Sequence, residues 1–138
     1  NIVQIGISDF ANSKAYAKRV REAGIHVIDR AQMRSESLQE IAASAIAIAG
    51  ENHRVIYLDI DMDVCDRSVV PACPASVPGG LSADELRQLV ALLSADPRVR
   101  ATDITEIDAS IDSEDGRTVR LAALVILEMA TSRALLKQ

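Results

Sequence analysis

Three aspartates alternate with apolar residues in the segment VIYLDIDMDVCDR, at Asp59, Asp61 and Asp63. They follow the apolar residues of a predicted buried strand, where negative charge serves no packing role. Carboxylates crowded in this way repel one another, and a cation relieves the repulsion. Oxygen ligands of this kind suit Mg²⁺, Ca²⁺ or Mn²⁺. The segment therefore predicts a metal site, with a solvated acidic loop as the simpler alternative.

Predicted strands and helices alternate along the chain, and the acidic residues follow strands. The strands cover residues 1–7, 25–29, 54–61 and 98–107, and the helices residues 12–24, 35–50, 81–96 and 117–136. The apolar runs are mostly continuous, which is typical of a parallel sheet covered by helices on both faces. In such sheets, ligands bind beyond the carboxyl ends of the strands. We therefore expect the aspartates and Glu106, in the TEID segment, at one edge of a three-layer αβα fold.

Capping residues mark where two of the helices begin. Ser37 with Glu40, and Ser82 with Glu85, have the S-x-x-E spacing of a capping box. In this motif the serine side chain binds a backbone N–H of the first turn, and the glutamate side chain binds the serine N–H. Gly24 stands where a left-handed residue would end the first helix. These signals separate the helices from the loops that carry the acidic residues.

The composition limits the classes of function. The chain has 138 residues, 49% of them hydrophobic, and a formal net charge of -5. A nucleic-acid-binding surface would show a basic stripe, which this sequence lacks. No apolar run approaches the roughly 18 residues that a membrane span needs. Because the two cysteines suggest no disulfide framework and no signal peptide precedes the first strand, we expect a cytoplasmic protein.

Two common carboxylate motifs fit the aspartates poorly. An EF-hand loop beginning at Asp59 needs Gly at its sixth position and Glu at its twelfth, where Val64 and Val70 stand. A phosphatase of the haloacid dehalogenase type also places D-x-D after a strand, but it prefers a small residue and Thr soon afterwards. A phosphotransfer enzyme that uses an aspartate as nucleophile nevertheless stays open as an alternative.

The histidines and cysteines show no pattern of their own. His26 and His53 lack the spacing of metal ligands, so we expect them at surface or packing positions. Cys65 and Cys73 have no basic residue placed to activate them, and we expect both to pack inside the loop.

The segment from Tyr57 to Ser82 resembles the second signature of the ureohydrolase family, which contains arginases, agmatinases, guanidino-acid hydrolases and formimidoylglutamases. The family pattern is an apolar strand, D-x-D, a further Asp and a Pro-bearing loop that closes on G-G-L-[ST]. This chain reads DIDMDVCDRSVVPACPASVPGGLS. The later DITEID also matches, because the family carries a Glu at that strand end. Residues 1–27 look most like the formimidoylglutamase branch, and the resemblance implies the arginase-like fold.

The resemblance implies a role for each matching acid. Asp61 and Asp63 match the metal-binding aspartates of the D-x-D, with Asp61 bridging two Mn²⁺ ions and Asp63 binding one of them. Glu106 matches the catalytic acid that faces the amidine or guanidinium group of the substrate. Asp66 matches an aspartate that we expect to shape the loop. Asp59 stands where the family has a small residue, and we interpret it as an additional acid beside the metal ligands.

The loop and the segment after Glu106 provide further candidates. Gly79 and Gly80 form the G-G of the signature and are expected to shape the loop. Arg67 replaces the usual Pro and is a candidate for binding the glutamate tail of a substrate. Asp108 and Asp112 are the corresponding candidates for a polyamine tail. The sequence leaves the choice between these tails open.

The resemblance implies a manganese-dependent hydrolase that cleaves a C–N bond in a linear amidine, converting formimidoylglutamate into glutamate and formamide. An agmatinase or a guanidino-acid hydrolase that releases urea is the alternative. The EIDA segment, in place of E-[VIL]-[ND]-P, also leaves open a catalytically inactive relative that acts as a binding protein.

Two further metal-binding motifs of the family, G-G-[DN]-[HN] and D-A-H-x-D, do not occur in this sequence. We therefore expect residues 1–138 to be the C-terminal half of a single arginase-like domain whose N-terminal half is absent. Such a half would be inactive alone, because it lacks ligands that a binuclear site needs. By resemblance, the complete enzyme would be a homo-oligomer, a trimer or a hexamer, acting on a small molecule.

Overall fold

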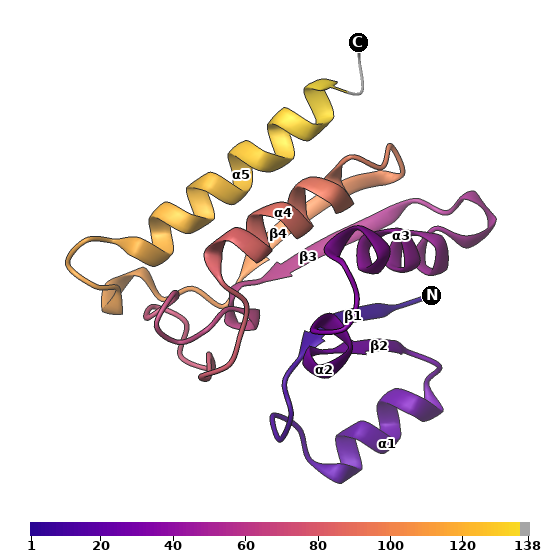
Figure 1. Ribbon diagram of the computed structural model, residues 1–138, viewed down its shortest axis with the longest axis horizontal. Helices are drawn as coiled ribbons and strands as arrows, with labels where there is room; N and C mark the ends of the chain where they lie inside the picture. Colours follow the sequence, from indigo (N-terminus) through magenta and orange to yellow (C-terminus); the bar gives the residue numbers. More distant parts are fainter. Residues whose placement is uncertain (136–138) are drawn as a thin grey trace.

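The computed structural model describes residues 1–135 (Figure 1). The strands are β1 (Val3–Ile7), β2 (His26–Asp29), β3 (Ile56–Asp61) and β4 (Val99–Thr105). The α-helices are α1 (Lys14–Glu22), α2 (Arg30–Met33), α3 (Leu38–Ala49), α4 (Ala83–Ser94) and α5 (Arg117–Leu135), and the 3₁₀ turns are η1 (Glu51–His53), η2 (Met62–Val64) and η3 (Ala109–Ile111). The predicted alternation of strands and helices is confirmed. Helix α2 and the 3₁₀ turns were not predicted, and position 136 of the last predicted helix lies outside the described residues.

The strands pair in parallel, β1 with β2 and β3 with β4. Figure 1 shows all four strands running toward the same end of the molecule. The predicted α/β class with parallel strands is therefore confirmed. Within residues 1–135, however, the two pairs form separate two-stranded sheets, because β1 and β3 do not hydrogen-bond to each other.

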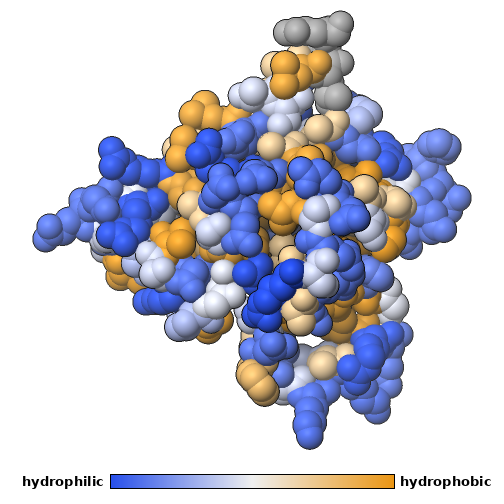
Figure 2. All heavy atoms as spheres, viewed as in Figure 1, coloured by the Kyte–Doolittle hydropathy of each residue, from blue (hydrophilic) through white to orange (hydrophobic). Residues whose placement is uncertain are grey.

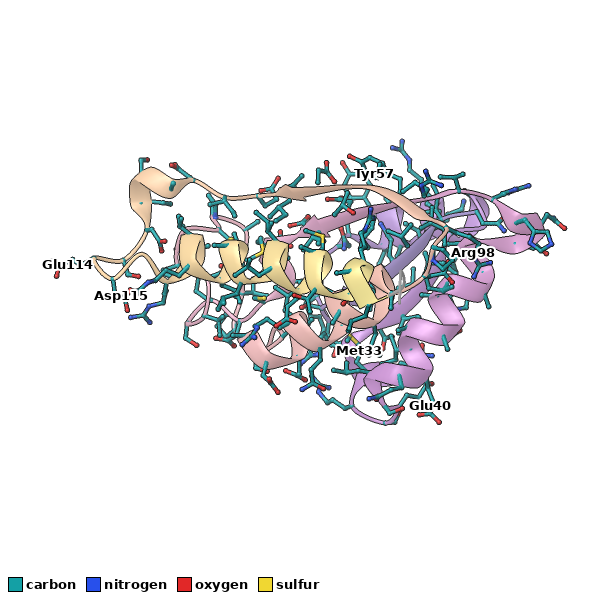
Figure 3. The ribbon with its side chains drawn as sticks, turned by 90° about the horizontal axis from the view of Figure 1, so that it is seen from above. Met33, Glu40, Tyr57, Arg98, Glu114 and Asp115 are labelled. Atoms are coloured by element: carbon teal, nitrogen blue, oxygen red, sulfur yellow. The ribbon has the colours of Figure 1, made fainter. Side chains whose placement is uncertain are left out.

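The core lies on one face of the β3–β4 pair. Ile60 of β3 is buried there together with Ile41 of α3, Leu89 of α4 and Val125 of α5. On the opposite face of β3, Tyr57 and Asp59 are exposed, and the exposed fraction of Tyr57 is 62%. Figure 3 shows Tyr57 on the side of the sheet away from α5. Among the described residues, helices thus cover one face of this pair. The continuous apolar runs in the sequence had predicted that helices would cover both faces.

The capping residues act as predicted. The Ser37 N–H donates to the Glu40 carboxylate at 2.9 Å, and the Ser82 N–H donates to the Glu85 carboxylate at 2.7 Å. Gly24 follows α1 with a φ of +68°, the left-handed conformation that glycine adopts without strain. None of the helices described within residues 1–135 combines the length and the apolar character that crossing a bilayer requires.

The loop between β3 and α4, predicted as irregular, follows a path fixed by hydrogen bonds. Leu81 pairs with Cys65 in an isolated parallel bridge, so the two ends of the loop lie side by side. Arg30 of α2 is 9% exposed and donates to the carbonyl oxygens of Gly79 and Gly80, each at 3.2 Å. A planar guanidinium presents several donors in a fixed arrangement, which suits two neighbouring carbonyls. Arg30 therefore holds the G-G turn in place.

We expect Gly80→Ala to destabilise the chain, because a Cβ at this position would lie 2.3 Å from the Asp66 nitrogen and 2.3 Å from the Cys65 carbonyl carbon. These are backbone atoms that cannot rotate away, so the free energy of unfolding should fall by about 2 kcal/mol or more. Gly24→Ala is the control, since its Cβ would meet nothing within 4 Å. It should cost about 1 kcal/mol through its left-handed φ. Urea unfolding measures both, and a Gly80→Ala chain as stable as the wild type would contradict this packing.

Candidate active site

The predicted acidic residues gather at the carboxyl ends of β3 and β4. Asp61 is the last residue of β3, and Asp63 lies in the η2 turn that follows. Glu106 directly follows β4, whose last residue, Thr105, pairs with Asp61. Parallel pairing of the two strands therefore brings Asp61, Asp63 and Glu106 to one edge of the sheet.

The carboxylates of Asp61 and Asp63 lie close together. Asp61 Oδ1 accepts a hydrogen bond from the Asp63 N–H at 3.1 Å and so caps the η2 turn. Burial raises the pKa of Asp63 to about 6, and the negative charges of Asp61 and Glu106 contribute to the rise. Among the described residues, no lysine or arginine forms an ion pair with these three carboxylates. Their mutual repulsion is therefore left without a cationic side chain to balance it.

Glu106 leaves the end of β4 in a strained backbone conformation. Its φ is +62°, which for a residue with a Cβ costs about 1 kcal/mol or more. The chain beyond it is fixed to the loop between β3 and α4, because the Asp108 N–H donates to the Ala72 carbonyl at 2.9 Å. Glu106 is exposed, so its carboxylate is accessible at the edge of the site. Strain of this kind persists where the surrounding contacts enforce it, and it is common at functional sites.

Asp59 lies two residues before Asp61 and therefore on the same face of β3. Its Oδ1 accepts a hydrogen bond from the Thr105 hydroxyl at 3.0 Å. Burial raises the pKa of Asp59 despite this bond, and the charges of Asp103 and Asp61 contribute. Asp103 pairs directly opposite Asp59, and one of its carboxylate oxygens is buried without a hydrogen-bond partner among the described residues. Sequence reasoning missed Asp103, since the strand register alone reveals that it faces Asp59.

Asp66 holds the loop between β3 and α4 together through hydrogen bonds. Its carboxylate accepts hydrogen bonds from the Ser68 N–H at 2.8 Å, the Ser68 hydroxyl at 2.6 Å and the Gly79 N–H at 2.7 Å. These donors lower the pKa of Asp66 to about 2. Gly79 has a φ of +95° and turns the chain toward Gly80. The charge of Asp66 is thus used to hold the loop.

The three residues named for the substrate tail form hydrogen bonds with nearby parts of the chain. Arg67 Nη1 donates to the Cys73 carbonyl at 2.7 Å and to the Ser76 hydroxyl at 3.3 Å. Asp108 accepts from the Ser110 N–H at 3.0 Å. Asp112 accepts from the Val119 N–H at 3.1 Å, near the start of α5. These contacts stabilise turns and a helix end, and none of them favours one substrate tail over the other.

The cysteines and histidines occupy the positions predicted for them. Cys65 and Cys73 are free and completely buried. Burial raises the pKa of Cys65 to about 12 and that of Cys73 to about 11, so both thiols stay protonated and unreactive. His26 and His53 are exposed at or before the amino ends of β2 and β3, at the far end from the acidic cluster.

The acidic cluster offers the kind of ligand that a hard metal ion prefers. Asp61 and Asp63 provide carboxylate oxygens, which Mn²⁺ accepts, and their mutual repulsion is what a cation would relieve. Within residues 1–135, however, no group of three or more His, Cys, Asp or Glu side chains has an arrangement that could hold a metal. The two aspartates are therefore a partial ligand set.

Comparison with known proteins gives a consistent result. The chain matches the Arginase family model over residues 1–131. The formimidoylglutamase of Halalkalibacterium halodurans is 39% identical over 127 residues, which are 92% of this chain and 40% of that protein. The crystal structure of Bacillus subtilis formimidoylglutamase aligns with a TM-score of 0.91 and 32% identity over 96% of this chain and 42% of that chain. Trypanosoma cruzi formiminoglutamase with Mn²⁺ aligns with a TM-score of 0.84 at 21% identity, over 96% of this chain and 44% of that chain, which supports the fold.

The chain spans less than half the length of each of these proteins. Over that span the fold is arginase-like, as the signature between Tyr57 and Ser82 predicts. The family match covers both strands that carry the acidic cluster and the loop between them. The chain belongs to the arginase family.

Proposed function

We propose that the complete protein is a manganese-dependent hydrolase that cleaves a C–N bond in a linear amidine, with formimidoylglutamate as its substrate. The observation that carries this proposal is the cluster of Asp61, Asp63 and Glu106, which lacks a cationic partner among the described residues. Relatives named formimidoylglutamase, at 39% and 33% identity, support this substrate over a guanidine. Agmatine or a guanidino acid, with urea as a product, is the alternative.

The proposal includes a longer protein, of which residues 1–138 are the C-terminal half of one arginase-like domain. Two observations support it: the chain matches 40% of the Halalkalibacterium halodurans relative, and Asp61 and Asp63 are a partial ligand set. The remaining ligands would come from the other half. A cytoplasmic location and a trimeric or hexameric assembly, both expected from the family resemblance, belong to the same proposal.

Asp61 and Asp63 would hold Mn²⁺ through their carboxylate oxygens. This choice of metal is supported by the Mn²⁺ in the Trypanosoma cruzi formiminoglutamase structure. When bound, such ions lower the pKa of water and allow hydrolysis at neutral pH. The aspartates balance the charge of the metal. Asp59, bonded to Thr105 across the strand pair, keeps the end of β3 fixed against β4 beside Asp61.

Glu106 is placed to bind the cationic nitrogen of the substrate. An ionised carboxylate forms a charge-assisted hydrogen bond to an amidinium N–H, which is stronger than a bond between neutral groups. The left-handed φ of Glu106 fixes how the chain leaves β4 at the edge that carries Asp61 and Asp63. Water adds to the formimino carbon, the bond from that carbon to the glutamate nitrogen breaks, and this nitrogen takes up a proton. The products are formamide and glutamate.

Arg67 is not included among the proposed substrate ligands, because its Nη1 is bonded to the Cys73 carbonyl and the Ser76 hydroxyl of its own loop. The two carboxylates of a glutamate tail require cationic or N–H donors. We therefore propose that the part of the protein outside residues 1–138 supplies them.

The whole product of the gene, loaded with Mn²⁺, should release formamide from formimidoylglutamate. Asp61→Asn should lower kcat/KM at least about 100-fold, because loss of a direct ligand costs more than loss of its hydrogen-bonding support. Glu106→Gln should lower kcat/KM about 10- to 100-fold through the loss of a charge-assisted bond. Glu22→Gln is the matched control, since Glu22 is an exposed carboxylate on α1 and should leave the rate unchanged.

The same assay with agmatine separates the alternatives. Urea released from agmatine, with no formamide from formimidoylglutamate, would overturn the substrate and keep the hydrolytic site. No product from either compound would sink the hydrolase proposal and favour an inactive binding protein. An Asp61→Asn enzyme as active as the wild type would instead overturn the role of Asp61 as a metal ligand.

Residues 1–138 alone should bind Mn²⁺ weakly, with a Kd above about 100 μM, because two aspartates meet a small part of the roughly six-coordinate shell of a hard cation. Isothermal calorimetry measures this, with Asp63→Asn expected to remove the residual binding and Glu22→Gln expected to leave it. A Kd below about 1 μM for the 138-residue chain would mean that a complete site is already present.

A further inference from the structure

A buried hydroxyl connects the start of α5 to the loop between β3 and α4. Thr118 is the second residue of α5, and its Oγ1 accepts a hydrogen bond from the Ala72 N–H at 3.1 Å. Both residues are completely buried, and they lie 46 positions apart in the sequence. A buried N–H without a partner is costly, because no water replaces the lost bond. The Thr118 hydroxyl therefore fixes this part of the loop against α5.

Ala72 carries the connection onward to the segment that follows Glu106. The Ala72 carbonyl accepts a hydrogen bond from the Asp108 N–H at 2.9 Å, two residues beyond Glu106. Between these two residues, Ile107 packs against the core. Figure 1 shows the segment between β4 and α5 beside the loop, at the carboxyl ends of the strands. Ala72 thus joins α5, through its N–H, to the chain that leaves β4, through its carbonyl.

Asp112 holds the first turn of α5, from which Thr118 projects. Its Oδ2 accepts a hydrogen bond from the Val119 N–H at 3.1 Å, and its Oδ1 accepts one from the Thr118 N–H at 3.4 Å. The first N–H groups of a helix have no acceptor within the helix, so a carboxylate placed there satisfies them. One turn further along α5, Leu121 is buried in the core. Thr118 therefore lies on a part of α5 that is fixed on both sides.

The end of the molecule that carries Glu106 is otherwise open to solvent. Figure 2 shows hydrophilic residues over the end where the segment between β4 and α5 lies, and Glu106 itself is exposed. Its φ of +62° is unfavourable for a residue with a Cβ and persists where surrounding contacts enforce it. Strand β4 fixes the chain before Glu106, and the bonds through Ala72 fix the chain after it.

We propose that Thr118, supported by Asp112, is a positioning residue for the catalytic acid Glu106. It acts through Ala72, which holds the Asp108 N–H and so keeps the chain after Glu106 in its left-handed turn. This inference rests on the proposed role of Glu106 in binding the cationic nitrogen of the substrate. It also gives Asp112 a use at the start of α5, in place of the polyamine tail that the sequence suggested.

The aspartates that would bind the metal have separate supports. Asp61 is held by the pairing of β3 with β4, and the Asp63 N–H donates to Asp61 Oδ1. These contacts do not include Ala72 or Thr118. A change at Thr118 should therefore disturb Glu106 while the affinity for Mn²⁺ stays the same, which distinguishes positioning of the acid from a general loosening of the site.

Kinetics of the complete, Mn²⁺-loaded protein with formimidoylglutamate test the proposal. Thr118→Val keeps the shape of the side chain but removes the hydroxyl, and it should lower kcat/KM about tenfold. In a Glu106→Gln background the same change should lower kcat/KM less than about twofold, because the acid that it would misplace is already lost. Thr118→Ser keeps the hydroxyl and should restore most of the activity. Val125→Ala is the matched control, since it opens a cavity beneath the same helix and should lower stability but leave kcat/KM unchanged.

Two kinetic outcomes would overturn the proposal. A loss of kcat/KM that is equal in the wild-type and Glu106→Gln backgrounds would mean that Thr118 supports the structure in general. A Thr118→Val enzyme as active as the wild type, or one that loses affinity for Mn²⁺ together with its activity, would also contradict a specific effect on Glu106.

Hydrogen exchange of the complete protein, measured by mass spectrometry on overlapping peptides, tests the connection without a substrate. The Asp108 amide should exchange at least about tenfold faster in Thr118→Val than in the wild type, and at the wild-type rate in Thr118→Ser. Asp112→Asn is a milder variant, because it keeps the Thr118 hydroxyl and one acceptor oxygen, and it should speed the same amide about threefold.

The exchange result separates this inference from the proposed function. A wild-type rate at the Asp108 amide in both Thr118→Val and Asp112→Asn would overturn the connection through Ala72. Fast exchange of this amide in Thr118→Val, in a protein whose wild type hydrolyses neither formimidoylglutamate nor agmatine, would support the connection and overturn the proposed function instead.

Discussion

The parallel pairing of β3 with β4 is the interaction on which the rest of the site depends. Strands that run in the same direction end at the same edge, so acids that are far apart in sequence meet there. The register places Asp61 opposite Thr105, and Asp63 and Glu106 follow these two residues. A slip of one residue would turn every side chain of one strand to the other face. Asp59 would then lose its hydrogen bond from the Thr105 hydroxyl, and Asp61 would point into the apolar core.

A second constraint acts on the loop that follows β3. Asp66 and Arg30 hold this loop from opposite directions, one from within it and the other from α2. Arg30 follows β2, whereas the carbonyls that it binds, at Gly79 and Gly80, follow β3. The two strand pairs are thus connected by a side chain at the end where the acidic cluster lies. Among the described residues, no strand hydrogen bonds join the facing edges of β1 and β3.

The sequence predicted helix starts well, because each one depends on residues that are close together in the chain. The capping boxes at Ser37 and Ser82 depend on residues three positions away, and both form. The φ of Glu106 could not be predicted, because it depends on the bond that ties Asp108 to Ala72, far away in the sequence. The exposed face of β3 was also missed, since an apolar run does not show which of its residues will meet a helix.

The acidic residues were predictable as a group, while their partners were not. A run of aspartates after an apolar strand indicates a cation without knowledge of the fold, because the charges repel wherever the loop lies. The partner of an arginine side chain cannot be predicted in this way. The sequence shows that Arg67 is charged, but its hydrogen bond to the Cys73 carbonyl depends on the path of a loop that no sequence pattern specifies. Asp103 likewise reads as one polar residue in a strand until the register sets it against Asp59.

The crowded carboxylates and the free strand edges have one feature in common, namely polar groups that lack a partner among the described residues. Asp63 shows it through a pKa raised to about 6, and Asp103 through a buried oxygen that accepts no hydrogen bond. The edges of β1 and β3 show it through backbone groups that have no strand partner among the described residues. Side-chain charge is visible in a sequence, whereas every residue except proline carries the same backbone donor and acceptor. The acidic site could therefore be predicted from the sequence, whereas the free strand edges became visible when the strands were placed in space.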